Sequence, residues 1–208
     1  MKITKYLHSC LLVEDRDKTI LIDPGQYTYD AHVFHIGTLK ALDYILITHE
    51  HFDHLYIPFV TELLQKFPKA TIISNQSVKE ILSKEHIYVE TDGNGFILLE
   101  EVPHENIFDK EPPQNLKFIL FDKLTTPGDS FHFSLTTDIL AMPITAPWGS
   151  LLEAVGVIEE LKPKVVIPIH DWHWKDDARK AFYKRLTDHF QKLGIDFKGV
   201  ETGETIEV

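Results

Sequence analysis

Short runs of apolar residues, each bounded by polar or turn-forming residues, recur along the chain. Runs of this kind that are rich in Val, Ile and Leu predict β-strands. A polar turn at 15–18 joins two of them, and a long aromatic loop at 27–35 follows the turn Asp23-Pro24-Gly25. Strands are predicted at 3–6, 10–14, 19–23, 44–48, 71–73, 96–102, 116–124, 139–144 and 165–169, with two short strands at the C-terminal end.

Apolar residues spaced roughly three or four positions apart predict helices between the later strands. Ser74 or Asn75 is predicted to cap one helix and Ser150 another, because their side-chain oxygens can accept hydrogen bonds from the free N–H groups of a first turn. Pro163 and Gly194 are predicted to end two helices. The helices are predicted at 57–67, 75–84, 150–161 and 175–193.

The order of these elements predicts an α/β fold. Strands open the chain, and strands then alternate with helices in both halves, which indicates two sheets with helices on their outer faces. No linker, low-complexity segment or short-period repeat interrupts the pattern. Residues 1–208 are therefore predicted to form one domain.

Composition narrows the class of protein. Of the 208 residues, 43% are hydrophobic and 25% are charged, which is typical of a soluble globular chain. A net charge of −11, with arginine only at Arg16, Arg179 and Arg185, argues against a nucleic-acid binder with a broad basic surface. The single Cys10 excludes an internal disulfide and fits a reducing compartment.

The chain carries no sign of export or membrane insertion. No apolar run approaches the roughly 18 residues of a membrane span, and the N-terminus lacks the apolar core of a signal peptide. We therefore expect a cytoplasmic protein with a small-molecule substrate, no nucleic-acid partner and no membrane contact. Assembly into a homo-oligomer stays open.

The most specific motif comes directly after the apolar run 44–47. It contains His49, His51, Asp53 and His54 in the order His-x-His-x-Asp-His. Imidazole and carboxylate groups are ligands of zinc and related divalent metals. Alternate residues of an extended chain share a face, so the first two histidines can point to one side, while the last two residues can turn toward a second metal. A histidine-rich surface loop is the weaker interpretation, because four ligand types occur at this spacing.

Three later residues share the same setting, a potential ligand placed soon after an apolar strand. They are His104, Asp129 and His170. Side chains at strand ends gather along one edge of a sheet in α/β proteins. Each residue alone has an ordinary explanation as a loop or turn residue. Together with the four motif residues they make seven candidate ligands, which suits two metal ions that share one carboxylate.

These motifs resemble those of the metallo-β-lactamase superfamily, whose members are metal-dependent hydrolases with a four-layer αββα sandwich. Within it, the chain is most similar to the small single-domain hydrolases of the ascorbate-phosphate-lactonase-like type. The resemblance covers nearly the whole length and rests on segments 7–10, 19–24, 45–54, 128–130, 138–143 and 165–170.

The resemblance implies a cofactor of two divalent metal ions, with zinc considered first and manganese or iron also compatible. Asp23 resembles the family aspartate that orients a ligating imidazole. His8 matches a family position near the site, and equally fits a histidine hydrogen-bonded at a sheet end. His86 is the alternative to His104 as a ligand. The implied ligands are His49, His51 and His104 for one ion, and Asp53, His54 and His170 for the other, with Asp129 bridging.

Two departures from family patterns narrow the activity. The β-lactamases of this fold commonly use a cysteine in the second site, whereas Asp129 takes the matching position here and Cys10 is far from it, so β-lactam hydrolysis is not expected. The diiron oxygen-reducing branch carries Glu where this chain has His51. A diiron redox enzyme and a non-catalytic metal-binding regulator stay open as alternatives.

The expected activity is hydrolysis of an ester-like bond, in a lactone or a phosphoester, by a hydroxide held between two metals. Asp53 is the expected catalytic proton acceptor. The loops that follow the ligand-bearing segments are predicted to select the substrate, with 27–35 as one wall. The same aromatic residues would also suit a packed sandwich edge or a subunit contact. The candidate substrate-binding residues are His8, Trp148 and His173.

Overall fold

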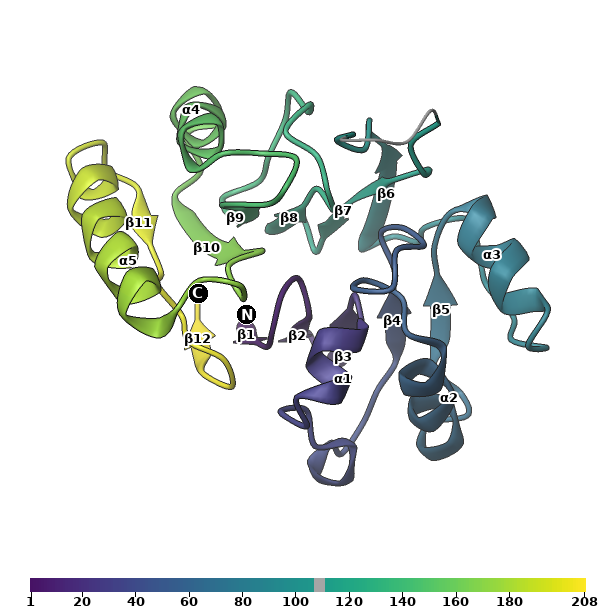
Figure 1. The fold of residues 1–208 in the computed structure, drawn as a ribbon. Coiled ribbons are helices and arrows are strands. Elements are labelled where there is room, and N and C mark those ends of the chain that lie inside the picture. The colour runs from purple at the N-terminus through teal and green to yellow at the C-terminus, as the bar shows by residue number, and fades with distance from the viewer. Residues whose placement is uncertain (107–110) are drawn as a thin grey trace.

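Two six-stranded sheets lie face to face in the computed structural model, which describes residues 1–106 and 111–208 (Figure 1). The first sheet runs in the order β12 (Thr205–Glu207), β1 (Lys2–Lys5), β2 (Leu11–Asp15), β3 (Lys18–Ile22), β4 (Tyr44–Leu46) and β5 (Thr71–Ile73). The second runs in the order β11 (Asp196–Phe197), β10 (Val165–Ile169), β9 (Ile139–Pro143), β8 (Leu124–Thr126), β7 (Leu116–Leu120) and β6 (Ile97–Glu101).

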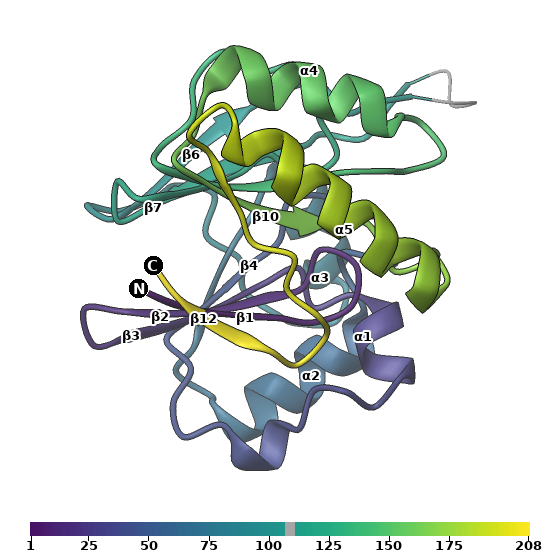
Figure 2. The same cartoon turned by 90° about the vertical axis from the view of Figure 1, so that its left-hand side faces the viewer.

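Helices cover the outer face of each sheet, which gives four layers (Figure 2). The first sheet is covered by α1 (Gln26–Asp30), α2 (Ile57–Lys66) and α3 (Gln76–Ser83), with a 3-10 turn at Ile36–Thr38. The second is covered by α4 (Leu151–Leu161) and α5 (Asp176–Gln191). This is the αββα arrangement that the resemblance predicted.

Alternating residues of each strand divide the interior into three apolar layers. In β2, Leu11 faces the core between the two sheets, and Leu12 packs with the helices outside the first sheet. In β9, Ile139 belongs to the same inter-sheet core, and Leu140 packs with the helices outside the second. The nearly continuous apolar runs in the sequence reflect strands that are buried on both faces.

Parallel pairing brings the carboxyl ends of several strands to one edge of the sandwich. Strands β3, β4 and β5 are parallel neighbours, as are β8, β9 and β10. His49 follows β4, Asp129 follows β8 and His170 follows β10. The candidate ligands are thus delivered from both sheets to the same edge.

Most predicted elements are confirmed, with ends shifted by one or two residues. Asn75 caps α3 by accepting from the N–H of Val78, and Ser150 begins α4 in a capping box. The prediction of a single strand at 116–124 was wrong. The segment is a hairpin of β7 and β8, because Phe121 and Asp122 both adopt positive φ and turn the chain. The loop predicted at 27–35 overlaps the short helix α1.

In the described part of the chain, no helix is both long enough and apolar enough to span a membrane.

Candidate metal centre

The motif loop after β4 is held in place by Asp23, which is fully buried at the end of β3. Its carboxylate accepts the backbone N–H of Thr48 at 2.8 Å and lies 2.8 Å from Nδ1 of His54. Gly25 touches the same loop so closely that a Cβ there would lie 1.7 Å from the carbonyl oxygen of Asp53. The turn after β3 and the histidine motif therefore fit together only with glycine at this position.

A second turn presents Asp129. Gly128 has φ of +60°, and a Cβ there would lie 2.1 Å from Oδ1 of Asn115. Asn115 clamps the turn, because its Nδ2 donates to the carbonyl of Pro127 at 2.9 Å and its Oδ1 accepts the N–H of Asp129 at 3.2 Å. The buried Asn115 had no signal in the sequence, since nothing near it marks a site.

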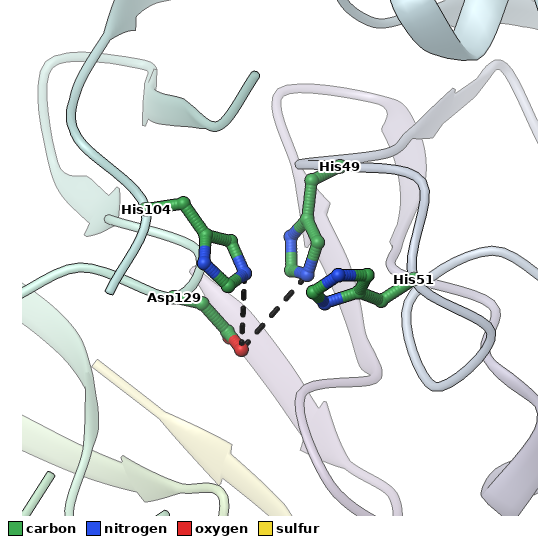
Figure 3. A group of neighbouring side chains, drawn as sticks. All are labelled: His49, His51, His104 and Asp129. Carbon is green, nitrogen blue, oxygen red and sulfur yellow. Dashed lines mark ion pairs between the residues drawn. The ribbon is translucent and has the colours of Figure 1, made fainter. Parts of the chain in front are cut away.

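Four side chains form the first group of potential ligands: His49, His51, His104 and Asp129 (Figure 3). One donor atom from each lies within 4.8 Å of the others. Oδ2 of Asp129 is 3.9 Å from Nε2 of His49 and 3.7 Å from Nε2 of His104. Nδ1 of His104 donates to the carbonyl of Glu105, which leaves Nε2 free to face the group.

The structure therefore brings His104 into the group. The alternative, His86, is exposed just beyond α3 and belongs to neither group of potential ligands.

The second group consists of His8, His54 and His170, again with donor atoms within 4.8 Å of one another. The other carboxylate oxygen of Asp129 reaches this group. Its Oδ1 is 2.7 Å from Nε2 of His170 and 3.1 Å from Nε2 of His54. One carboxylate thus lies between two sets of imidazoles and turns a different oxygen toward each.

His8 and His170 are joined although they come from different sheets. The N–H of His170 donates to the carbonyl of His8 at 3.2 Å, and the two rings lie 3.8 Å apart. Both residues adopt φ of 63°, a conformation that costs a non-glycine residue about 1–3 kcal/mol. The fold holds them there, so their rings face the site.

Asp53 is placed next to the second group but is not a member of it. Its Oδ2 lies 3.1 Å from Nε2 of His8, and its side chain is 20% exposed. The sequence interpretation gave Asp53 a ligand role and His8 a substrate role, whereas the geometry puts the His8 ring among the donors. Both assignments stay predictions. The contact between His8 and His170 of the second half of the chain could not be predicted, because no residue near His8 in the sequence marks it.

The buried polar atoms of these residues provide a test of whether metal ions fit. Several make no hydrogen bond of suitable geometry in the described structure, although buried polar groups normally make one. A cation coordinated by these nitrogen and oxygen atoms would satisfy them, so the donor set fits divalent metals. They include His8 Nε2, His49 Nε2, His54 Nε2, His104 Nε2, His170 Nε2 and Asp129 Oδ1.

The protonation states of most of these residues also suit metal ligands. Burial lowers the pKa of His8 to about 3 and that of His49 well below its usual value, so both rings are neutral. Burial alone would raise the pKa of Asp129, but the surrounding imidazoles hold it well below normal. Burial would lower the pKa of His54, yet Asp129 and Asp23 hold it well above normal. Metal binding at Nε2 of His54 therefore requires the loss of a proton.

A pocket of about 450 Å³ opens beside the two groups. His8, Trp148 and His173, the candidate substrate-binding residues, all line it, and Nε1 of Trp148 donates to Oδ2 of Asp129 at 3.0 Å. Of the predicted wall 27–35, Tyr27 lines the pocket. Phe34 and His35 of the same segment line a separate hollow near α2 instead.

A family model described as "Beta-lactamase superfamily domain" matches residues 2–170. The chain belongs to the beta-lactamase superfamily. The match covers every residue of the two groups of potential ligands. Of the residues that line the pocket, Trp172 and His173 lie beyond it. The superfamily therefore accounts for the motif, the four-layer fold and the strand-end placement of the donors together.

Several known proteins match the chain almost end to end. The chain is 31% identical to Protein Rv0786c of Mycobacterium tuberculosis, over 90% of this chain and 92% of the relative. It is 25% identical to a UPF0173 metal-dependent hydrolase of Carboxydothermus hydrogenoformans, over 99% of each. A metallo hydrolase from the archaeon Ignicoccus hospitalis has the same fold, with a TM-score of 0.69 at 20% identity over 100% of this chain and 98% of that one.

Proposed function

We propose that this member of the beta-lactamase superfamily, a metal-dependent hydrolase, holds two divalent metal ions and cleaves an ester-like bond. The observation that carries the proposal is the place of Asp129, whose Oδ2 faces the first group of imidazoles and whose Oδ1 faces the second. A carboxylate in this position suits a bridging ligand. Zinc, manganese and iron(II) all accept such nitrogen and oxygen donors.

In the proposed site, the first ion is held by the first group and the second ion by the imidazoles of the second group, with Asp129 shared. Two bound ions of this kind would supply Lewis acidity and a hydroxide near neutral pH, because a divalent metal can lower the pKa of coordinated water toward about 7. Nδ1 of His54, fixed by Asp23, keeps Nε2 directed at the ion.

Asp53 is the proposed proton acceptor. Burial would raise the pKa of its carboxyl, but the His8 imidazole, 3.1 Å away, and the nearby imidazole of His54 hold it well below normal, so it is ionised at neutral pH. The partly exposed carboxylate lines the pocket together with Asp129. It can therefore reach a proton released as water attacks a substrate in the pocket.

The kinds of atom in the two groups of potential ligands support an ester-like substrate. No cysteine lies in either group of potential ligands, and Cys10 is buried outside them. An ester-like bond, in a lactone or a phosphoester, is proposed over a β-lactam.

The experiment is a hydrolysis screen of the zinc- and manganese-loaded protein over lactones, carboxyl esters, phosphodiesters and penicillins. Asp53→Asn keeps an oxygen in place but loses basicity, so it should lower kcat at least roughly a hundredfold. The exposed Asp92→Asn is the matched control. Penicillin turnover above every ester and phosphodiester, or full activity of Asp53→Asn at normal metal content, would contradict the proposal.

A further inference from the structure

The pocket beside the ligand groups has an aromatic wall. The rings of Tyr27 and Trp172 lie 4.0 Å apart with an angle of 30° between their planes, so they stack on one another as an aromatic pair, which we call the shelf. The ring of Phe52 meets that of Tyr27 edge to face, 5.5 Å away and at an angle of 76°, outside the residues that line the pocket. Trp172 is 36% exposed and Phe52 is 54% exposed, so apolar surface is left open where the shelf meets solvent.

The shelf is separate from the packed core. Trp172 lines the pocket, whereas Trp174, two residues later, packs on Phe182 and joins the apolar layer beneath α5. If these aromatic side chains served only to pack the edge of the sandwich, no pocket beside them would be expected. Here the shelf borders a pocket of about 450 Å³, within the range of about 300–1,000 Å³ typical of small-molecule sites.

Apart from the proposed metal ions, the charges on the described part of the pocket wall are negative. Asp53 and Asp129 are the charged side chains among the described lining residues, and neither lysine nor arginine is among those residues. A phosphate or carboxylate group on the far side of the substrate would therefore meet no cationic side chain on this wall.

We propose that the pocket selects esters whose group beside the scissile bond is flat, apolar and uncharged, with Tyr27 and Trp172 as the shelf on which it stacks. This inference rests on the proposed function and narrows it from ester-like bonds in general to neutral, aryl-bearing carboxyl esters and lactones. The aryl group of the substrate contacts the shelf face to face or edge to face. The carbonyl group of the ester then lies beside the two groups of potential ligands.

A matched series of lactones tests the substituent alone. γ-Butyrolactone is compared with its γ-phenyl and γ-carboxy derivatives, using the zinc-loaded protein. We expect kcat/KM for the phenyl compound to exceed that of the parent by at least roughly tenfold, as one apolar group in a fitted pocket allows. The carboxy compound should fall below the parent. A carboxy compound that equals or exceeds the phenyl compound would overturn the inference.

Variants locate the effect on the shelf. Trp172→Ala should reduce the ratio of kcat/KM between the phenyl and parent lactones toward one, while Trp172→Phe should restore most of it. Tyr88→Ala removes an exposed ring that is absent from the pocket lining and should leave the ratio unchanged. An unchanged ratio in Trp172→Ala would show that the shelf does not select.

A binding measurement separates this inference from the proposed function. 5-Phenyl-2-pyrrolidinone, the lactam counterpart of the phenyl lactone, should quench or shift the tryptophan fluorescence of the zinc-loaded protein. Trp172→Ala should weaken its affinity at least roughly tenfold relative to 2-pyrrolidinone. Binding without hydrolysis of any ester would support the shelf and contradict the proposed reaction. Ester hydrolysis without a phenyl preference, in binding or in rate, would support the reaction and overturn the shelf.

Discussion

Nε1 of Trp148 donates a hydrogen bond over 3.0 Å to Oδ2 of Asp129. The same oxygen faces His49 and His104, so the indole and the first group of imidazoles share one carboxylate oxygen. Trp148 also lines the pocket. A single side chain thus connects the wall that meets the substrate with the carboxylate that lies between the two ligand groups.

Replacing Trp148 with Phe should weaken metal retention. The ring remains, but the carboxylate loses a donor that fixes its orientation, and partners of this kind typically contribute about 10–100-fold to metal affinity. Competition with a chelator measures the dissociation constant of each ion. Trp174→Phe is the matched control, because Trp174 does not contact Asp129. Equal zinc retention in Trp148→Phe and the unchanged chain would show that the hydrogen bond does not support the ligand.

Gly128→Ala should destabilise the fold and lower zinc content together. Its φ of +60° disfavours alanine, and the added Cβ would lie 2.1 Å from Oδ1 of Asn115 and 2.9 Å from Cβ of Thr48. A loss of at least about 2 kcal/mol in the free energy of unfolding is expected. Urea denaturation measures it. Gly95→Ala meets nothing within 4 Å and should change stability little, and comparable stability of the two variants would contradict the assignment.

The buried ammonium of Lys5 supports the loop that carries His170. Its Nζ lies 2.6 Å from Oδ2 of Asp171 and 2.8 Å from the hydroxyl of Tyr183, and it is almost fully buried. Lys5→Met leaves the carboxylate of Asp171 without its cation and should lower the free energy of unfolding by about 3–5 kcal/mol.

The matched control for Lys5→Met is Lys164→Met. Lys164 pairs with Asp138 at a similar distance of 2.8 Å, but on the surface, where an ion pair contributes little. Thermal or urea unfolding of the two variants gives the comparison. Equal losses of stability would show that the Lys5 cluster is not a structural anchor.

Acid should destabilise the metal-free protein over a defined range of pH. Burial lowers the pKa of His8 to about 3, against 6.5 for the unfolded chain, so between these values the unfolded state binds more protons. The penalty is absent above about pH 6.5 and grows as the pH falls toward 3. At pH 5 it amounts to about 2 kcal/mol for His8.

Urea denaturation of the chelator-treated protein at pH 7 and pH 5 measures this dependence. His8→Phe, which cannot be protonated, should show a smaller loss between the two values. A pH dependence equal to that of the unchanged chain would contradict the buried, neutral state of His8.

Local sequence patterns predicted many helices and strands correctly, but they could not predict contacts between residues that are far apart in the chain. Asn75 and Ser150 could be predicted to begin helices, because a helix cap depends only on residues within the first turn. The break between β7 and β8 was missed because Phe121 and Asp122 adopt positive φ without the glycine that usually marks such a turn. Here the pairing of the two strands overrides local preference.

The site shows the same division between local and long-range information. The motif 49–54 could be identified because its residues are adjacent and chemically distinctive. The place of His8 among the donors depends on the contact of its carbonyl with the N–H of His170, which follows β10 of the other sheet. The burial of Lys5 beneath α5 depends on a contact 166 residues away in the chain. Neither contact leaves a pattern near the residue itself.

The most direct test of the account is the metal content of the purified chain after reconstitution with zinc, measured for three proteins. The unchanged chain should hold two ions. His170→Ala should retain the ion of the first group and lose most of the second. Asp129→Ala should lose both, because each ion depends on one of its carboxylate oxygens. A single ion in the unchanged chain, or two ions retained by Asp129→Ala, would contradict a metal pair built around this carboxylate.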